Sequence, residues 1–502
     1  MLLVDGRSLD LERYGAVVFG RARCALDDTA RKRVDAARQT VLDTLKKKEA
    51  VYGVNTGFGD LAKVRIAPDK LALLQERLIL SHCAGVGQPL DPAAVRGMLL
   101  LRANTLARGH SGVRAEIIDA LLSLLNANVL PLVPSRGSVG ASGDLAPLAH
   151  LVLPLLGKGE LQVNGSLLPA DEGLARAGIE AFTLEPKEGL ALINGTQAMT
   201  ALLANAVIAV RRLVRAADLI AALSVDALRG TDAAFDPRLH ALRPYPGQQA
   251  SAGNLFTLLK GSEIRESHRF GDVRVQDPYS LRCAPQVHGA ARDVLTDVEY
   301  KLAIEMNAVT DNPLIFPEDG AIISGGNFHG QPIAVAADML GMAVAELGTI
   351  SERRIEKLTN TAFSGLPPFL VKDAGLNSGF MIAQVTAAAL ASESKGLAHP
   401  ASVDSIPTSA DKEDHVSMGM GAALKLESIV SNTSTIFAIE LLCAAQGIDL
   451  LRPMRTSAPL EALHAAVRED IEVWNEDREM ARDISRAVEF LNRIDSFIDG
   501  LA

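Results

Sequence analysis

The sequence predicts a mainly α-helical protein, with a loop-bearing helical N-terminal domain over residues 1–195 and a long-helix bundle over residues 196–502. Three observations support this fold class. Ala and Leu are abundant, whereas aromatic residues make up only 4% of the chain, and this composition favours helix. Gly and Pro interrupt short helical patterns through the first 195 residues. Beyond them, long stretches without proline repeat apolar residues at helical spacing.

The longest of these stretches runs from Thr196 to Leu228. Further helical stretches are expected near residues 289–309, 333–360, 376–397, 417–448 and 476–496. At 1.5 Å per residue, such helices would be about 30–45 Å long, and their apolar stripes need partners. A bundle supplies those partners. Ile333–Val344 is apolar over much of its circumference, so we expect it to face other chains as well.

Charge and composition exclude several classes of partner. A net charge of −10 without any basic run argues against nucleic acid and anionic membranes. The start of the chain lacks a signal-peptide pattern, and the longest apolar run, residues 198–210, is too short to span a membrane. The four cysteines are scattered, which predicts a reducing cytoplasm. Neither they nor the ten histidines show metal-ligand spacing, so we expect no metal.

The chain is organised around residues 137–150, Gly-Ser-Val-Gly-Ala-Ser-Gly-Asp-Leu-Ala-Pro-Leu-Ala-His, which predict a tight loop followed by a helix. Within it, the nitrogen of Gly143 is unhindered enough to attack the carbonyl carbon of Ala141. Loss of water closes a five-membered ring, and loss of a second water from Ser142 leaves a conjugated methylene, a strong electrophile. A bare Ala-Ser-Gly is normally only a connector, so the longer string carries the argument.

This string closely resembles the signature of the aromatic amino acid ammonia-lyase family, whose histidine, phenylalanine and tyrosine members carry a methylidene-imidazolone (MIO) group. The resemblance extends over nearly the whole chain. It implies a 4-methylideneimidazole-5-one cofactor made from Ala141, Ser142 and Gly143. It also implies an ammonia-lyase/fumarase-like fold and a homotetramer in which each active site is built from three chains.

Residues 52–59, Tyr-Gly-Val-Asn-Thr-Gly-Phe-Gly, place Tyr52 on or beside an exposed, glycine-rich loop. The segment resembles the loop that covers the active site in this family, where the matching tyrosine removes the β-proton of the substrate. A phenol has a pKa of about 10, so this role requires neighbours that stabilise the phenolate.

In residues 275–286, the side chains of Gln276, Tyr279 and Arg282 recur every third position, which directs them to one surface of a short helix. By resemblance, Arg282 grips the substrate carboxylate through a bidentate fork. Tyr279 matches a second essential tyrosine, the alternative candidate for proton transfer. Gln276 is expected beside them in substrate binding.

Two further motifs point to the prosthetic group. Asn194 precedes Gly-Thr and could simply cap a helix. By resemblance, its amide contacts the MIO group or the amino acid part of the substrate, where a donor would stabilise developing negative charge. In residues 324–332, the resemblance places Phe328 against the prosthetic ring.

Substrate choice is expected to depend on His82 and Glu413. Members of the family that act on histidine show Ser-His where this chain has Ser81-His82, and they carry a glutamate at the position of Glu413. A carboxylate suits a polar imidazole and would be left buried and unpaired against a phenyl ring. The chain departs from the family at Asp411-Lys412, where Asn-Gln is common in the histidine enzymes.

The resemblance therefore implies non-oxidative elimination of ammonia from L-histidine, giving trans-urocanate. The methylidene carbon derived from Ser142 would capture the substrate while Tyr52 takes the β-proton. Tyrosine or phenylalanine ammonia-lyase activity and a MIO aminomutase remain alternatives. A catalytically silent helical scaffold is a further alternative, against which the intact Ala-Ser-Gly, both tyrosines and Arg282 argue.

Overall fold

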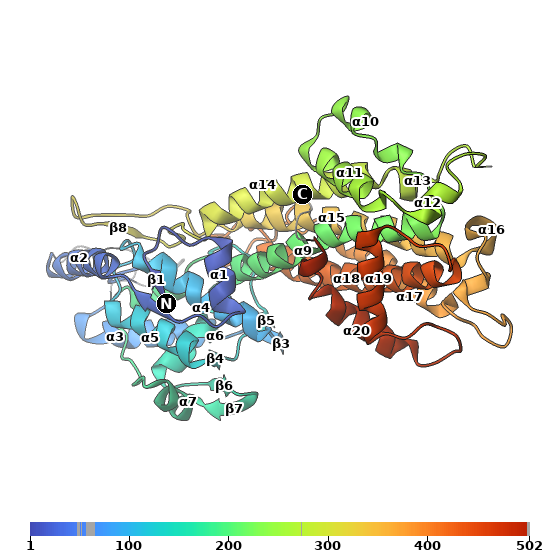
Figure 1. The fold of residues 1–502 in the computed structure, drawn as a ribbon. Helices are drawn as coiled ribbons and strands as arrows, with labels where there is room; N and C mark the ends of the chain where they lie inside the picture. The colour runs from blue at the N-terminus through green and yellow to red at the C-terminus, as the bar shows by residue number, and fades with distance from the viewer. Residues whose placement is uncertain (48–50, 52, 57–65, 273, 499–502) are drawn as a thin grey trace. The chain divides into compact units, whose positions relative to one another are not determined.

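The structure, a computed structural model, describes residues 1–47, 51, 53–56, 66–272 and 274–498, and they form a mainly helical protein (Figure 1). The predicted helical fold class is confirmed. The chain forms two compact units. The first comprises Met1–Asn205, Glu299–Asp338 and Pro400–Leu424, and the remaining segments form the second. Along the chain, the first unit runs to Asn205, and two later segments return to it.

The first unit contains short and medium helices. These are α1 (Leu11–Val18), α2 (Asp28–Lys46), η2 (Pro68–Lys70), α3 (Leu71–His82), α4 (Pro92–Ala107), α5 (Ala115–Ala127), α6 (Leu145–Val152), η3 (Leu153–Leu156), α7 (Ala170–Ala177) and α8 (Glu188–Ile193). Helix α4 packs against α5 and is buried from Ala94 to Ala107, so it forms the centre of this unit.

Local sequence explains where these helices begin and end. Asp27 accepts hydrogen bonds from the backbone at the start of α2, and Asp91, followed by proline, does so for α4. Helix α5 ends where Asn128 adopts a left-handed conformation with φ 54°.

Short strands in the first unit pair into small sheets. Strands β1 (Leu2–Val4) and β2 (Cys24–Leu26) are parallel, and all other pairs are antiparallel. The antiparallel sheets are β3–β5 (Val86–Pro89, Pro134–Arg136), β4–β6–β7 (Val129–Pro131, Glu160–Val163, Ser166–Pro169) and β8–β9 (Leu314–Phe316, Ala321–Ile323).

Four long helices are α9 (Gln197–Ala227), α14 (Ala284–Glu305), α15 (Gln331–Thr359) and α18 (Gly419–Leu450), labelled in Figure 1. The bounds of α9, α15 and α18 lie within two residues of the stretches expected from the sequence, whereas α14 begins five residues and ends four residues earlier than expected. The remaining helices all belong to the second unit, and they are η4 (Ala233–Phe235), α10 (Pro237–Ala241), α11 (Pro246–Leu259), α12 (Glu263–Ser267), α13 (Tyr279–Arg282), α16 (Thr361–Ser364), η5 (Pro368–Leu370), α17 (Met381–Leu397), α19 (Ala458–Asp470), α20 (Met480–Leu491) and α21 (Asp495–Ile498).

Buried polar contacts tie the long helices together inside the second unit. Arg354 of α15 forms a two-bond ion pair with Glu440 of α18, with Nε–Oε1 and Nη2–Oε2 distances of 2.5 and 2.9 Å. Asp218 of α9 accepts a hydrogen bond from the ring of His288 on α14 at 2.8 Å. Because buried charges are costly unless paired, these contacts specify which helix faces which.

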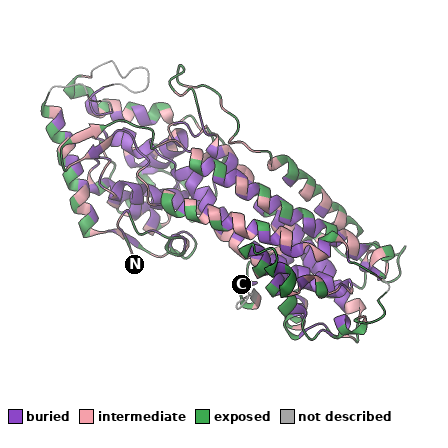
Figure 2. Ribbon diagram, turned by 90° about the horizontal axis from the view of Figure 1, so that it is seen from above, coloured by how far each residue is buried: buried purple, intermediate pink, exposed green. Residues whose placement is uncertain are grey.

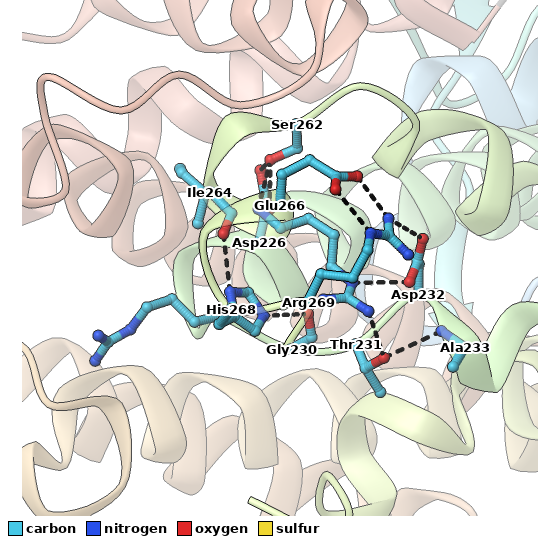
Figure 3. A network of polar contacts seen from close by, with 12 residues as sticks. Asp226, Gly230, Thr231, Asp232, Ala233, Ser262, Ile264, Glu266, His268 and Arg269 are labelled. Atoms are coloured by element: carbon cyan, nitrogen blue, oxygen red, sulfur yellow. Dashed lines mark hydrogen bonds and ion pairs between the residues drawn. The ribbon is translucent and has the colours of Figure 1, made fainter. Parts of the chain in front are cut away.

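A second polar network fixes the segment that follows α9 (Figure 3). The hydroxyl of Ser262, which caps α12, bonds the carboxyl of Asp226 in the last turn of α9. The ring of His268 bridges the carbonyls of Ile264 and Gly230, and Arg269 pairs with Glu266. Burial raises the pKa of Asp226 to about 6.

Helices α15 and α18 are long and apolar enough to cross a membrane by length and composition. However, 67% of the most apolar part of α15 and 72% of that of α18 are buried within the structure. Figure 2 shows buried residues along the length of the long helices, as expected for core helices of a folded protein.

Candidate active site

The glycine-rich loop takes a left-handed backbone at two glycines near its centre. Gly140 and Gly143 have φ values of 65° and 67°, and an isolated backbone bridge joins Ala141 to Gly143. A Cβ atom at position 143 would lie 2.1 Å from the carbonyl oxygen of Gly195. The bridge therefore brings together the two residues whose backbones would have to bond, and the expected helix follows as α6.

Asp144 ties this loop to the start of α9. Its Oδ2 accepts hydrogen bonds from the backbone N–H groups of Ala198 and Met199, each at 2.9 Å, and Oδ1 accepts from the Ser138 hydroxyl at 3.0 Å. Burial nevertheless dominates and raises the pKa of Asp144 to about 7. A carboxyl at the N-terminus of a long helix also interacts favourably with the helix dipole.

A distant segment completes the loop. The hydroxyl of Ser417 donates to the carbonyl oxygen of Gly140 at 2.8 Å, and the backbone N–H of Met418 donates to that of Val139 at 2.8 Å. The Ala-Ser-Gly tripeptide is thus held from both sides, by α9 and by the residues just before α18.

A cavity of about 790 Å³ opens beside the tripeptide, inside the first unit. The residues lining it are Leu78, His82, Ala141, Ser142, Leu145, Leu190, Asn194, Asn312, Gly326, Phe328, His329, Ser409, Ala410, Lys412, Glu413, Asp414 and His415. This volume matches that of ordinary small-molecule sites.

At this cavity the Ser142 hydroxyl donates to Oε1 of Glu413 at 2.8 Å. The other oxygen, Oε2, accepts from the hydroxyls of Thr408 and Ser409 at 2.7 and 2.9 Å. The carboxylate therefore presents one oxygen to the side chain that would yield the electrophilic methylene.

His82 is the last residue of α3, and its ring reaches the same cavity. Nδ1 lies 2.8 Å from the carbonyl oxygen of Leu78, so in the neutral ring Nδ1 carries the proton and donates it. This assignment leaves Nε2 as a hydrogen-bond acceptor.

Asn194 ends α8, and its amide nitrogen donates to the carbonyl oxygen of Asn312 at 3.1 Å. Within the described part of the chain, its amide oxygen is buried without a hydrogen-bond partner. Behind it, Nη1 of Arg102 donates to the Asn194 carbonyl oxygen at 3.0 Å. Burial lowers the pKa of Arg102 to about 10. A buried amide with a spare acceptor is typical of a site that receives a ligand.

The structure brings several of the predicted residues together at the cavity. Those lining it are His82, Ala141, Ser142, Asn194, Phe328 and Glu413, and Gly143 lies next to them in the chain. Tyr52 lies outside the described residues.

The second unit contains the predicted trio Gln276, Tyr279 and Arg282. Tyr279 and Arg282 begin and end the short helix α13, and the Arg282 guanidinium lies over the Tyr279 ring, 4.6 Å from its centre. Nε of Arg282 donates to the Asp277 carbonyl oxygen at 2.9 Å. Within the chain, Tyr279 is 70% exposed.

Several polar cavity residues were not predicted from the sequence, among them Asn312, His329 and His415. The rings of His329 and His415 stack, with their centres 5.9 Å apart. His329 directly follows Phe328 and His415 lies two residues after Glu413, but no spacing rule pairs two histidines 86 residues apart. Among the described residues, no group of three or more His, Cys, Asp or Glu side chains could hold a metal ion.

Comparison with known proteins matches this geometry to one family. Residues 9–469 match the model of the aromatic amino acid lyases. A histidine ammonia-lyase of Anaeromyxobacter sp. (strain K) is 55% identical over 96% of this chain and 97% of its own length. The crystal structure of histidine ammonia-lyase from Trypanosoma cruzi is 46% identical, with a TM-score of 0.93 over 100% of this chain and 95% of its own. Tyrosine aminomutase from Streptomyces globisporus is 37% identical, with a TM-score of 0.94 over 100% of this chain and 99% of its own. With its Ala-Ser-Gly loop held beside a small-molecule cavity, the chain belongs to the aromatic amino acid lyase family.

Proposed function

We propose that the chain eliminates ammonia from L-histidine to give trans-urocanate. The observation that carries the proposal is the meeting of three side chains, Ser142, His82 and Glu413, at one cavity. The similarity to proteins named histidine ammonia-lyase, at up to 55% identity, supports the same substrate.

The tripeptide fits the MIO group. Three features suit a ring formed from these backbones: the Ala141–Gly143 bridge, the left-handed glycine without room for a Cβ, and the amide oxygen of Asn194, which has no partner among the described residues. Ring closure joins the Gly143 nitrogen to the Ala141 carbonyl carbon with loss of water, and Ser142 then loses its hydroxyl and its α-proton as a second water. The group supplies an exocyclic methylene that is electrophilic and makes ammonia a good leaving group.

The side chains around the cavity favour an imidazole ring. His82 Nε2 and Glu413 Oε1 are both acceptors, and an imidazole N–H can donate to either of them, or a protonated ring to both. A phenyl ring would leave both unpaired, and a phenol cannot supply the two N–H donors of a protonated imidazole. Leu78, Leu145 and Leu190 provide the apolar surface against which an aromatic ring can pack.

We assign the remaining steps to residues that match the family motifs. Arg282 binds the substrate carboxylate, with Gln276 beside it, and Tyr52 removes the β-proton, Tyr279 being the alternative for proton transfer. Phe328 orients the prosthetic ring. The assembly is a homotetramer with each site shared between chains, and the exposure of Tyr279 within a single chain supports a role across such an interface. The scattered, unpaired cysteines suit work in the cytoplasm.

The test is to incubate the purified protein separately with L-histidine, L-tyrosine and L-phenylalanine and to identify products by ultraviolet absorbance and mass spectrometry. Urocanate from histidine alone is expected, and Ser142→Ala should lose nearly all of this activity. Coumarate, cinnamate or a β-amino acid would overturn the substrate assignment in favour of a different lyase or an aminomutase. No product from any of them would favour a silent scaffold.

A further inference from the structure

The loop that carries Glu413 has an unusual backbone. Ser409, Ala410 and Asp411 follow one another with φ values of 52°, 53° and 62°, in the left-handed region that residues other than glycine rarely adopt. Each such residue costs about 1–2 kcal/mol. Only contacts made elsewhere in the loop can hold three of them in a row.

Those contacts lead from Thr408 to Glu413. The two residues face each other as an isolated antiparallel bridge, with backbone N–O distances of 3.0 and 3.3 Å. The turn between them brings the hydroxyls of Thr408 and Ser409 to the same carboxylate oxygen, Oε2 of Glu413. The strained turn thus delivers two donors to one atom.

The consequence is a carboxylate with a defined orientation. The last side-chain torsion of glutamate is broad and roughly two-fold, so an isolated carboxylate rotates readily. Here two donors occupy Oε2, and Oε1 faces Ser142 and the cavity. An acceptor that is fixed before the ligand arrives loses less conformational freedom when the ligand binds.

We propose that Thr408 and Ser409 are positioning residues that aim Oε1 of Glu413 at the ring of the substrate. This inference rests on the proposed function, because it assumes that Glu413 receives the imidazole. His329 supports the far end of the same loop, since its Nε2 lies 3.1 Å from the His415 carbonyl oxygen and its ring stacks on that of His415.

The experiment compares Thr408→Val, which keeps the shape but removes the hydroxyl, with Thr408→Ser, which keeps the hydroxyl. Ser409→Ala and the double variant Thr408→Val/Ser409→Ala complete the set. Thr40→Val is the matched control, because the Thr40 hydroxyl donates to a carbonyl within α2, at Ala36. For each full-length protein we would measure kcat and KM for L-histidine and the inhibition constants of imidazole and glycine.

A hydrogen bond to a charged group contributes enough that its loss should reduce kcat/KM by about 10- to 100-fold. We expect this loss in the double variant, carried mainly by KM, with a parallel weakening of imidazole inhibition. Glycine, which resembles only the amino acid part of the substrate, should inhibit all variants equally. Thr408→Ser should restore most of the activity that Thr408→Val loses, and Thr40→Val should match the parent.

Equal loss of imidazole and glycine inhibition would show general disruption of the site and overturn the proposal, as would a double variant that matches the parent. If Thr408→Val fails to fold, Ser409→Ala and Thr408→Ser carry the same comparison. The parent protein separates this inference from the proposed function. If the parent acts on tyrosine or phenylalanine instead, the function fails, and with it the premise that Glu413 receives an imidazole.

Discussion

Asp144 illustrates how a single buried residue couples the loop to pH. Its folded pKa of about 7 lies above the value of about 3.9 for an aspartate in an unfolded chain. Between these values the folded protein holds a proton that the unfolded chain has released. This group's contribution to stability is therefore greatest below about pH 4, falls as the pH rises toward 7, and is lost above it.

Asp144→Asn tests this coupling. Asparagine is uncharged, can accept from the backbone of Ala198 and Met199, and can donate to Ser138. We expect the free energy of unfolding to change less between pH 5 and pH 8 in this variant than in the parent. Asp144→Ala should lower the free energy of unfolding by at least about 1 kcal/mol at both pH values, because buried N–H groups lose their acceptor. Urea unfolding followed by circular dichroism measures both, and identical pH profiles for Asn and parent would contradict the assignment.

Asn194 should separate activity from stability. Its amide nitrogen makes one hydrogen bond, to Asn312, whereas its amide oxygen is unpartnered among the described residues. Asn194→Ala should therefore cost only about 1 kcal/mol of stability. Its kcat/KM should fall by at least about tenfold if the amide contacts substrate or prosthetic group. Steady-state kinetics and thermal unfolding of the same variant measure the two effects separately. Full activity would remove Asn194 from the site.

At the scale of elements, two helices start from one backbone contact. Gly143 bridges to Gly195, α6 starts two residues after the first and α9 two residues after the second. The backbone N–H of Asp144 also donates to the Gly195 carbonyl oxygen at 2.7 Å. The backbone of Gly143 and Asp144 is therefore fixed to the segment that starts α9.

Gly143→Ala should break this junction. The new Cβ would meet the Gly195 carbonyl oxygen at 2.1 Å, a backbone atom that cannot move aside. We expect a lower melting temperature and an intact mass that retains the two waters lost in ring formation. The matched control is Gly178→Ala, with φ 69° and open space around the new Cβ. It should cost only the backbone strain of about 1–2 kcal/mol and leave ring formation intact. Ring formation in Gly143→Ala would refute the steric argument.

Elements were predictable from sequence where the signal is local. Apolar periodicity without proline placed α9 within one residue at each end, Gln197–Ala227 against the expected 196–228. The family motif identified Ser142 and Glu413, but no local pattern shows that two residues 271 positions apart in the sequence form a hydrogen bond. The cap that Asp144 provides to α9 and the stacking of His329 on His415 also escaped prediction, because such contacts depend on how distant loops meet.

At the scale of the whole molecule, α17 indicates where assembly should occur. Its buried residues are Ala383, Ala387 and Ser394, whereas Ile382 and Val385 are 63% and 52% exposed. Apolar side chains on such a helix are typical of a surface covered by other chains.

Val385→Glu should weaken the proposed tetramer, because a charge would be buried at the contact. We expect sedimentation to shift from four chains toward smaller species, with activity falling in parallel if sites are shared between chains. Glu393→Gln, a charge change on the same helix, serves as the comparison. A fully active single chain would contradict the shared-site proposal.

The first unit is formed by segments that lie far apart in the sequence, and this has a consequence for the order in which the chain is synthesised. The backbone of Val139 and Gly140 is held by Ser417 and Met418, which the ribosome adds much later. At about 5–20 residues per second, the tripeptide waits on the order of tens of seconds for these partners. On the proposed chemistry, we therefore expect a nascent chain to carry an ordinary serine and the reactive carbon to arise only once nearly the whole polypeptide has been made.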